Sequence, residues 1–138
     1  MAKSFMGNGD TLEMGEELSS TNSKFNLRMQ DDGNLVLYCE GTPIWATRTD
    51  KKGSPPYKLV MQEDNQLCVY DGDNTCIWCT GTWKAGTGKA WCELLDNGNF
   101  FLYDGDAKKN PLWCTETEGG KRAPEEYHGE GHRLVERT

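Results

Sequence analysis

The chain of 138 residues lacks any long hydrophobic run. Its N-terminal stretch, MAKSFMGNGDTLEMGEEL, has no apolar segment of the length that a signal peptide or a membrane anchor requires, and no such segment follows. We therefore expect no signal peptide and no membrane insertion. The protein is expected to be cytoplasmic, or to reach the extracellular space by an unconventional route.

The chain also lacks a basic surface and amphipathic helices. Fifteen Lys and Arg residues against 22 Asp and Glu residues give a formal net charge of −7, with no basic stripe along the sequence. Such a surface repels the phosphate backbone, so we expect no nucleic acid partner. No stretch has the period of an amphipathic helix of useful length, which favours an all-β chain.

The cysteines form no recognisable metal or redox motif. There are six of them: Cys39, Cys68, Cys76, Cys79, Cys92 and Cys114. Without a leader they are expected to be reduced, although the number would also suit a disulfide framework. A redox pair needs a helix N-terminus, whereas the CIWC stretch at 76–79 reads as a strand, in which residues three apart point to opposite faces. Cys92 and Cys114 supply no second close pair, so no metal site and no cofactor are expected. Cys79 and Cys114 occupy the repeat position of Ala46, which favours small buried residues.

A hexapeptide occurs three times along the chain. It reads IWATRT, IWCTGT and LWCTET, each time an apolar residue, Trp, a small residue, Thr, a variable residue and Thr. The tryptophans are Trp45, Trp78 and Trp113, which are 33 and 35 residues apart. Large apolar side chains at equivalent positions of three repeats are expected to fill a shared centre.

A second block precedes each hexapeptide. The three blocks cover 30–38, 62–70 and 95–103, and each ends in Tyr. Apolar runs separated by Gly, Asp and Asn predict strand, turn, strand, turn, strand in every unit. Since one unit cannot bury a hydrophobic face alone, three are expected to close around a common axis as one all-β domain over 1–117. The segment 118–138, rich in Gly, Pro and charge, is expected to be a flexible extension outside the repeats.

The first block, QDDGNLVLY, permits two hairpins. A two-residue turn would pair Gln30 with Leu35 and place Val36 on the opposite face from Gln30. A three-residue loop over 32–34 would pair Gln30 with Val36, with Gln30, Val36 and Tyr38 on one exposed face and the alternating apolar residues in the core. We expect the three-residue loop, because it buries the apolar residues together.

The residues of that face suit a neutral polyol. They are Gln30, Asp32, Asn34, Val36 and Tyr38. Carboxylate and amide groups can bond adjacent hydroxyls, while Val and Tyr can pack on the C–H face of a pyranose. The DDGN residues would equally serve a hairpin turn that binds nothing. No nucleophile lies beside a base, and a single carboxylate lacks the partner that glycoside hydrolysis needs, so binding is expected and not catalysis.

The first block satisfies in full the signature Q-x-D-x-N-x-V-x-Y, and the chain thereby resembles the bulb-type, snowdrop-like mannose-binding lectins. The resemblance extends from about Phe5 to the WCTET around Trp113, and it implies the β-prism II fold with three antiparallel sheets related by a pseudo-threefold axis. It also places the disulfide of the plant lectins at Gly33 and Tyr57, where this chain has no cysteine. In character the chain is therefore similar to non-plant members such as the fish lily-type lectins.

The resemblance implies one mannose site per copy, with hydrogen bonds from the polar residues and ring contact from Val. The first copy keeps the whole set and is expected to bind. In the second copy Cys68 replaces Val and the Asn becomes Gln, so a weakened site is expected; its residues are Gln62, Asp64, Gln66 and Tyr70. In the third copy Leu95 and Phe101 replace Gln and Val, so no binding is expected from the remaining Asn97, Asn99 and Tyr103.

The function implied by the resemblance is non-catalytic recognition of mannose and high-mannose glycans, in a role such as innate defence. A single site of this kind binds weakly, so avidity is expected from multivalency, for instance in a homodimer that exchanges C-terminal strands. The alternative is a protein-interaction module, cytoskeletal or vesicle-associated, that keeps the prism but binds little sugar.

Overall fold

Each repeat folds into three antiparallel strands in the computed structural model, which describes residues 3–105 and 110–134. The first repeat forms β4 (Phe25–Met29), β5 (Leu35–Cys39) and β6 (Thr42–Ala46). The second forms β7 (Lys58–Met61), β8 (Leu67–Tyr70) and β9 (Cys76–Cys79). The third forms β10 (Trp91–Leu94), β11 (Phe100–Tyr103) and β12 (Pro111–Cys114).

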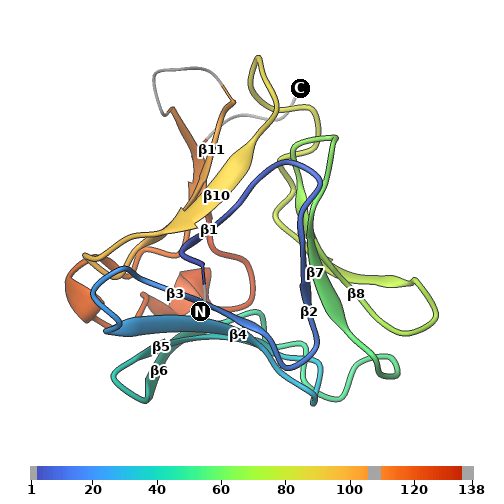
Figure 1. The fold of residues 1–138 in the computed structure, drawn as a ribbon, viewed down its shortest axis with the longest axis horizontal. Helices are drawn as coiled ribbons and strands as arrows, with labels where there is room; N and C mark the ends of the chain where they lie inside the picture. The colour runs from blue at the N-terminus through green and yellow to red at the C-terminus, as the bar shows by residue number, and fades with distance from the viewer. Residues whose placement is uncertain (1–2, 106–109, 135–138) are drawn as a thin grey trace.

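Three short N-terminal strands complete the sheets. They are β1 (Phe5–Met6), β2 (Thr11–Glu13) and β3 (Glu17–Ser19). Strand β3 pairs with β4, β2 with β7 and β1 with β10, so the N-terminal strand of every sheet comes from outside its repeat. Figure 1 shows the three sheets arranged around a common axis. The predicted all-β architecture of three sheets is confirmed.

Alternation along the strands builds the core. In β4 the side chains of Phe25, Leu27 and Met29 are buried, while those between them are half-buried. Leu35 and Leu37 of β5 face them across the hairpin, since Met29 is opposite Leu35 and Leu27 is opposite Leu37. Such pairs of apolar residues on the inner face of each sheet bury the surface that stabilises the prism.

The three hexapeptide tryptophans meet one another in the interior. The ring centroids of Trp45 and Trp78 are 5.9 Å apart, those of Trp45 and Trp113 are 5.6 Å apart and those of Trp78 and Trp113 are 5.9 Å apart. All three pairs are edge-to-face, the arrangement that the quadrupoles of aromatic rings favour. Each sheet thus contributes one ring to a shared aromatic cluster.

A bulge occurs at the same place in all three sheets. The register shifts between Leu37 and Tyr38, between Val69 and Tyr70, and between Leu102 and Tyr103. In the first sheet Leu37 is opposite Trp45 but Tyr38 is opposite Pro43, so one extra residue lies on β6. Two consecutive residues of the bulged strand therefore turn toward the core.

Residues 118–134, here called the C-terminal segment, pack against the repeats. The segment contains two 3₁₀ turns, η1 (Glu118–Gly120) and η2 (Glu125–Tyr127), and the strand β13 (His132–Arg133), which pairs with β12. The remaining residues of the predicted extension, 135–138, lie outside the described part of the chain.

The contacts of the C-terminal segment are made with its backbone. The indole N–H of Trp45 donates to the carbonyl of Tyr127 at 2.7 Å, that of Trp78 to Gly129 at 2.6 Å, and that of Trp113 to Glu130 at 2.9 Å. An extension outside the repeats does not describe residues 118–134, because the partly buried indole N–H groups need acceptors and this segment supplies them.

Within residues 3–105 and 110–134, no helix has the length and apolar character needed to cross a membrane.

Candidate functional site

The first repeat turns between β4 and β5 through a three-residue loop that ends in Gly33. Gln30 lies opposite Asn34, since the Gln30 N–H donates to the Asn34 carbonyl at 3.0 Å. The predicted pairing of Gln30 with Val36 is therefore wrong: the loop begins and ends one residue earlier than predicted, so that Arg28 is opposite Val36. The reason is that Gly33, with φ of 92°, takes the left-handed position that closes such a loop. Because both strands shift by one residue, Gln30, Val36 and Tyr38 still share the face opposite the core.

Three polar side chains of the first copy form one hydrogen-bond network. The Gln30 amide nitrogen lies 3.2 Å from each carboxylate oxygen of Asp32, and the Tyr38 hydroxyl donates to Gln30 Oε1. The backbone N–H of Asn34 donates to Asp32 Oδ1 at 2.9 Å. The exposed Asp32 carboxylate keeps free lone pairs, and the Tyr38 oxygen can still accept.

The amide of Asn34 is oriented by the hexapeptide. Its Oδ1 accepts from the Thr47 hydroxyl and from the backbone N–H of Thr49, each at 3.2 Å. A backbone N–H can only donate, so the atom that faces it is the amide oxygen. The NH₂ group of Asn34 thus points away from these partners, and among the described residues no hydrogen bond engages it.

Thr47 and Thr49 are positioning residues that sequence reasoning missed. The Thr49 hydroxyl donates to the Gly33 carbonyl at 2.6 Å, and the Thr47 hydroxyl accepts the N–H of Leu35 at 3.1 Å. The two hydroxyls lie 2.7 Å apart. They hold the loop of the hairpin to the segment that follows β6. The T-x-T pattern repeated in every hexapeptide was the signal that could have found them.

Two apolar contacts lie beneath this loop. Val36, expected on the exposed face, has only 5% of its surface accessible and forms the floor of the site. A Cβ atom placed on Gly33 would lie 2.9 Å from Cζ of Tyr57, whose side chain is buried. The Tyr57 ring therefore occupies the position where the resemblance places a disulfide.

The second copy keeps the network but not the amide anchor. Gln62 Nε2 lies 3.1 and 3.2 Å from the carboxylate oxygens of Asp64, and the Tyr70 hydroxyl donates to Gln62 Oε1. The hydroxyls of Thr80 and Thr82 still meet at 2.8 Å. Within the described chain, however, neither threonine bonds the side chain of Gln66, so that amide lacks the partners that orient Asn34.

The third copy keeps the amide anchor but not the polar network. Asn99 Oδ1 accepts from the Thr115 hydroxyl at 3.2 Å and from the Thr117 N–H at 3.3 Å, while Asn97 Oδ1 accepts the Asn99 N–H at 2.9 Å. An Asn thus replaces the carboxylate without changing the turn.

Aromatic rings cover the outer face of the third copy. Phe101 stacks on Tyr103 with centroids 5.2 Å apart, and Tyr103 lies against Trp91 at 4.9 Å. Leu95, at the position of Gln30, offers no hydrogen-bonding side chain. The face that carries polar groups in the first copy is therefore filled by the protein's own side chains.

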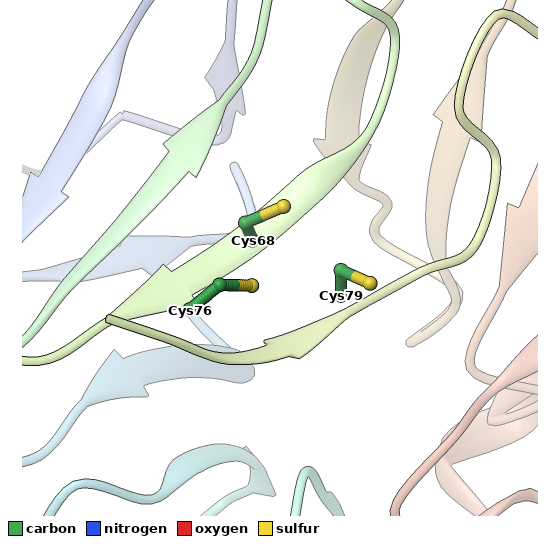
Figure 2. A group of neighbouring side chains, drawn as sticks. All are labelled: Cys68, Cys76 and Cys79. Atoms are coloured by element: carbon green, nitrogen blue, oxygen red, sulfur yellow. The ribbon is translucent and has the colours of Figure 1, made fainter. Parts of the chain in front are cut away.

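Cysteines gather on the outer face of the second copy. The bulge turns Ile77 and Trp78 toward the core together, so Cys76 and Cys79 both point outward, and Cys68 of β8 is directly opposite Cys79 (Figure 2). The prediction that residues 76 and 79 face opposite sides is wrong, because it assumed an unbulged strand. Cys79 is exposed and not buried as expected, whereas Cys114 is buried.

Burial dominates the acid–base properties of this face. It raises the pKa of the Cys68 thiol above its ordinary value, and the neighbouring thiols of Cys76 and Cys79 raise that pKa further. Burial, followed by the nearby Cys68 and Cys76, likewise raises the pKa of Tyr70. At neutral pH the Cys68 thiol and the Tyr70 phenol are therefore protonated, and Tyr70 can donate its hydrogen bond to Gln62.

Comparison with known proteins links the fold to sugar binding. Curculin-2 from Molineria latifolia is 39% identical over 74 residues, which cover 54% of this chain and 45% of that protein. The B-type lectin plumieribetin of the fish Scorpaena plumieri is 38% identical over 68 residues, covering 49% and 58%. The crystal structure of the mannose-specific agglutinin of snowdrop, Galanthus nivalis, complexed with methyl-α-D-mannoside, has a TM-score of 0.69 and 38% identity, covering 75% of this chain and 92% of that one.

The extent of these similarities differs. The chain spans about half the length of the curated relatives it matches, whereas it covers nearly all of the snowdrop agglutinin structure. No family model matches the sequence.

Proposed function

Because the chain belongs to the bulb-type mannose-binding lectin family, which binds carbohydrate and does not catalyse reactions, we propose that it recognises mannose through its first copy. The binding residues are Gln30, Asp32, Asn34, Val36 and Tyr38. The observation that carries the proposal is the Asn34 amide, whose oxygen is held by Thr47 and Thr49 and whose backbone N–H is bonded to the exposed Asp32 carboxylate.

These groups complement a vicinal diol. The Asp32 carboxylate accepts from a sugar hydroxyl, and the Asn34 NH₂ donates to the same or the adjacent oxygen. The Tyr38 oxygen and the remaining Gln30 N–H offer one further acceptor and donor. Val36 provides the apolar floor on which ring carbons rest. The resemblance assigns the axial 2-hydroxyl of mannose to Asp32 and Asn34.

The other two copies contribute less. In the second copy the Gln62, Asp64 and Tyr70 side chains are arranged as in the first, but Gln66 is not anchored, so weaker binding is proposed there. In the third copy Phe101 and Tyr103 fill the face, and no binding is proposed.

Biological use of one such site requires multivalency. A few hydrogen bonds to a monosaccharide give a dissociation constant of about 1 mM. Two sites on one particle raise the avidity for a mannose-rich surface by about 10² to 10⁴. We propose a homodimer that binds high-mannose glycans, such as those of microbial or foreign cells in innate defence. In the single chain β13 pairs with β12 of the same chain. In the proposed dimer, β13 of each chain would pair with β12 of the other chain.

The test is an isosteric pair of variants. Asp32→Asn removes the charge but keeps the turn, as Asn97 does in the third copy. Loss of a hydrogen bond to a charged group costs about 1.5 to 3 kcal/mol, so affinity for methyl mannoside should fall by about 10- to 150-fold. Asp64→Asn is the matched control and should leave the tighter binding event unchanged. Both are measured by NMR titration.

Three outcomes decide between the readings. Weaker mannoside binding in Asp32→Asn, with unchanged binding in Asp64→Asn, supports the proposal. Equal mannoside binding in wild type and Asp32→Asn contradicts the assignment of the first copy. If the folded wild-type protein does not bind mannoside, the lectin function is contradicted, and the protein-interaction module remains as the alternative function of the prism.

A further inference from the structure

Three thiols of the second repeat lie close enough to share one ion. The sulfur atoms of Cys68, Cys76 and Cys79 all lie within 4.8 Å of one another. Figure 2 shows Cys68 on β8 and the other two on the neighbouring β9. Cys68 is buried, whereas Cys76 and Cys79 are exposed, so the cluster has a fixed inner ligand and an open outer side.

The cluster is particular to the second repeat. The residue opposite the bulge tyrosine is Pro43 in the first repeat and Pro111 in the third, where the second has Cys76. Cys68 takes the place of Val36, and Cys79 takes the place of Ala46. Only in the second of the three repeats are all three positions occupied by cysteine.

The geometry is that of a thiolate metal site. With Zn–S bonds of about 2.3 Å, two sulfurs of a tetrahedral site are about 3.8 Å apart, so a closing movement of about 1 Å brings all three sulfurs into range. Cys76 and Cys79 are exposed on the solvent side of the hairpin, and the Cys76 thiol would exchange its hydrogen bond to the Trp78 carbonyl for the bond to the metal. We propose that Cys68, Cys76 and Cys79 bind one thiophilic divalent cation, such as Zn²⁺, with the fourth coordination position open to water or to an external ligand.

Binding is balanced by proton release. Each thiol that coordinates the ion forms a metal–sulfur bond and gives its proton to the buffer, so the cation displaces up to three protons. The thiols are reduced in the structure, and no electron transfer is involved. The competing chemistry is a disulfide between Cys68 and Cys79, which are directly opposite on neighbouring strands; it forms only when an external oxidant takes up the two electrons and the two protons of the thiols. It would remove two of the three ligands.

A second group of ligands acts as an internal competitor. Cys114, Glu116 and His132 also lie within 4.8 Å of one another. That group has a single thiol, and its Glu116 carboxylate is already 2.5 Å from His132 Nδ1. Soft cations prefer three thiolates to one, so the cysteine cluster is expected to bind first.

The experiment is a Cd²⁺ titration of the fully reduced full-length protein, followed by the cadmium–thiolate charge-transfer absorption and by metal analysis after gel filtration. Six free thiols are first verified in denaturant with a thiol reagent. Wild type should retain about one equivalent of tightly bound Cd²⁺, and Cd²⁺ should displace Zn²⁺ that was bound beforehand, because thiolates prefer the softer cation. The signal should be lost in Cys79→Ala, with an affinity at least about tenfold lower because one of three ligands is gone.

Cys114→Ala is the matched control. Both variants place alanine at the repeat position that Ala46 occupies in the first copy, so both should fold, and the near-UV circular dichroism of the tryptophan cluster verifies this. Cys114→Ala should bind as wild type does. Cys68→Val, which restores the residue of the first copy, should lose binding as Cys79→Ala does.

Two results would overturn the proposal. One is a fully reduced, folded wild-type protein that retains no Cd²⁺ or Zn²⁺. The other is binding that survives Cys79→Ala and disappears in Cys114→Ala, which would assign the ion to the competing group. Mannoside binding at the first copy does not depend on this outcome, so failure of the metal site and failure of the proposed function are separate results.

Discussion

The hydroxyl of Thr47 should matter both for stability and for binding, and Thr47→Val separates the two effects. The change replaces the hydroxyl by a methyl group of similar size in a buried position. It removes the acceptor of the Leu35 N–H and one of the two donors to Asn34 Oδ1. The matched change in the second repeat is Thr80→Val, which removes the acceptor of the Leu67 N–H but touches no site amide.

The magnitudes follow from these contacts. Leaving one buried N–H without an acceptor costs about 1 to 3 kcal/mol, so both variants should lose about 2 kcal/mol of unfolding free energy. For a domain of this size that corresponds to a fall in Tm of about 6 °C. Only Thr47→Val loosens the Asn34 amide. The loss of one orienting bond, about 1 kcal/mol, should weaken mannoside binding about fivefold.

Stability is measured by urea unfolding and affinity by NMR titration with methyl mannoside, below the unfolding transition of both variants. Equal weakening of binding by Thr80→Val and Thr47→Val would refute the reasoning, because it would trace the effect to general loosening of the prism. Unchanged mannoside affinity in Thr47→Val would also refute the reasoning, because the Asn34 amide would then bind sugar without its hydrogen bond from Thr47.

Two further predictions concern the frame of the fold. Although burial acts to raise the pKa of Asp104, its bonds from the N–H groups of 87–88, at 2.8 to 3.0 Å, hold that pKa below its ordinary value. The stabilisation by the Asp104 carboxylate is present above its unfolded-state pKa and is lost as pH falls through its folded-state pKa. Asp104→Asn should therefore lower the free energy of unfolding in urea by about 1 to 3 kcal/mol at pH 7, and by progressively less between about pH 5 and pH 2. A loss that does not depend on pH would contradict this. Gly131→Ala places a Cβ 2.1 Å from Trp113 and should displace the C-terminal segment, which would be seen as faster limited proteolysis. Gly129→Ala is the control, because Gly129 also has a positive φ but its Cβ would have its nearest neighbour at 3.7 Å. Equal proteolysis of the two variants would contradict the clash.

Much of the fold could be predicted because it is repeated. Three aligned copies of a strand pattern, each with a Trp at the same place, determine three equivalent sheets and a common aromatic centre. The register of the first hairpin could not be predicted from apolar alternation alone. When the loop moves by one residue, the pairing changes by two positions, and every side chain stays on the same face of the sheet. A further signal was present: a three-residue hairpin loop places its left-handed residue last, and Gly33 is the residue that suits that position.

The C-terminal segment shows where composition misleads. Its few apolar side chains predict a loose extension, and only Ala123 among them is counted in the core. The segment is held instead by backbone carbonyls that accept the indole N–H groups of the tryptophan cluster. Backbone acceptors are present in any sequence, so side-chain composition carries no information about them. The need for them could be inferred from three tryptophans at a shared centre, each of which requires one acceptor for its indole N–H.

The bulge connects the frame to the chemistry of the second repeat. Proline precedes Trp45 and Trp113 by two residues, and a proline inside a strand is typical of a bulge, because it cannot donate to the ladder. The same spacing before Trp78 places Cys76 at the bulge. The sequence therefore contained the signal that Cys76 and Cys79 share a face, although each repeat alone does not show it. In all three sheets the bulge turns two consecutive apolar residues inward, so the residues before and after them both point outward. In the second sheet these outward residues are Cys76 and Cys79, and their thiols determine what the outer face of the second repeat can bind.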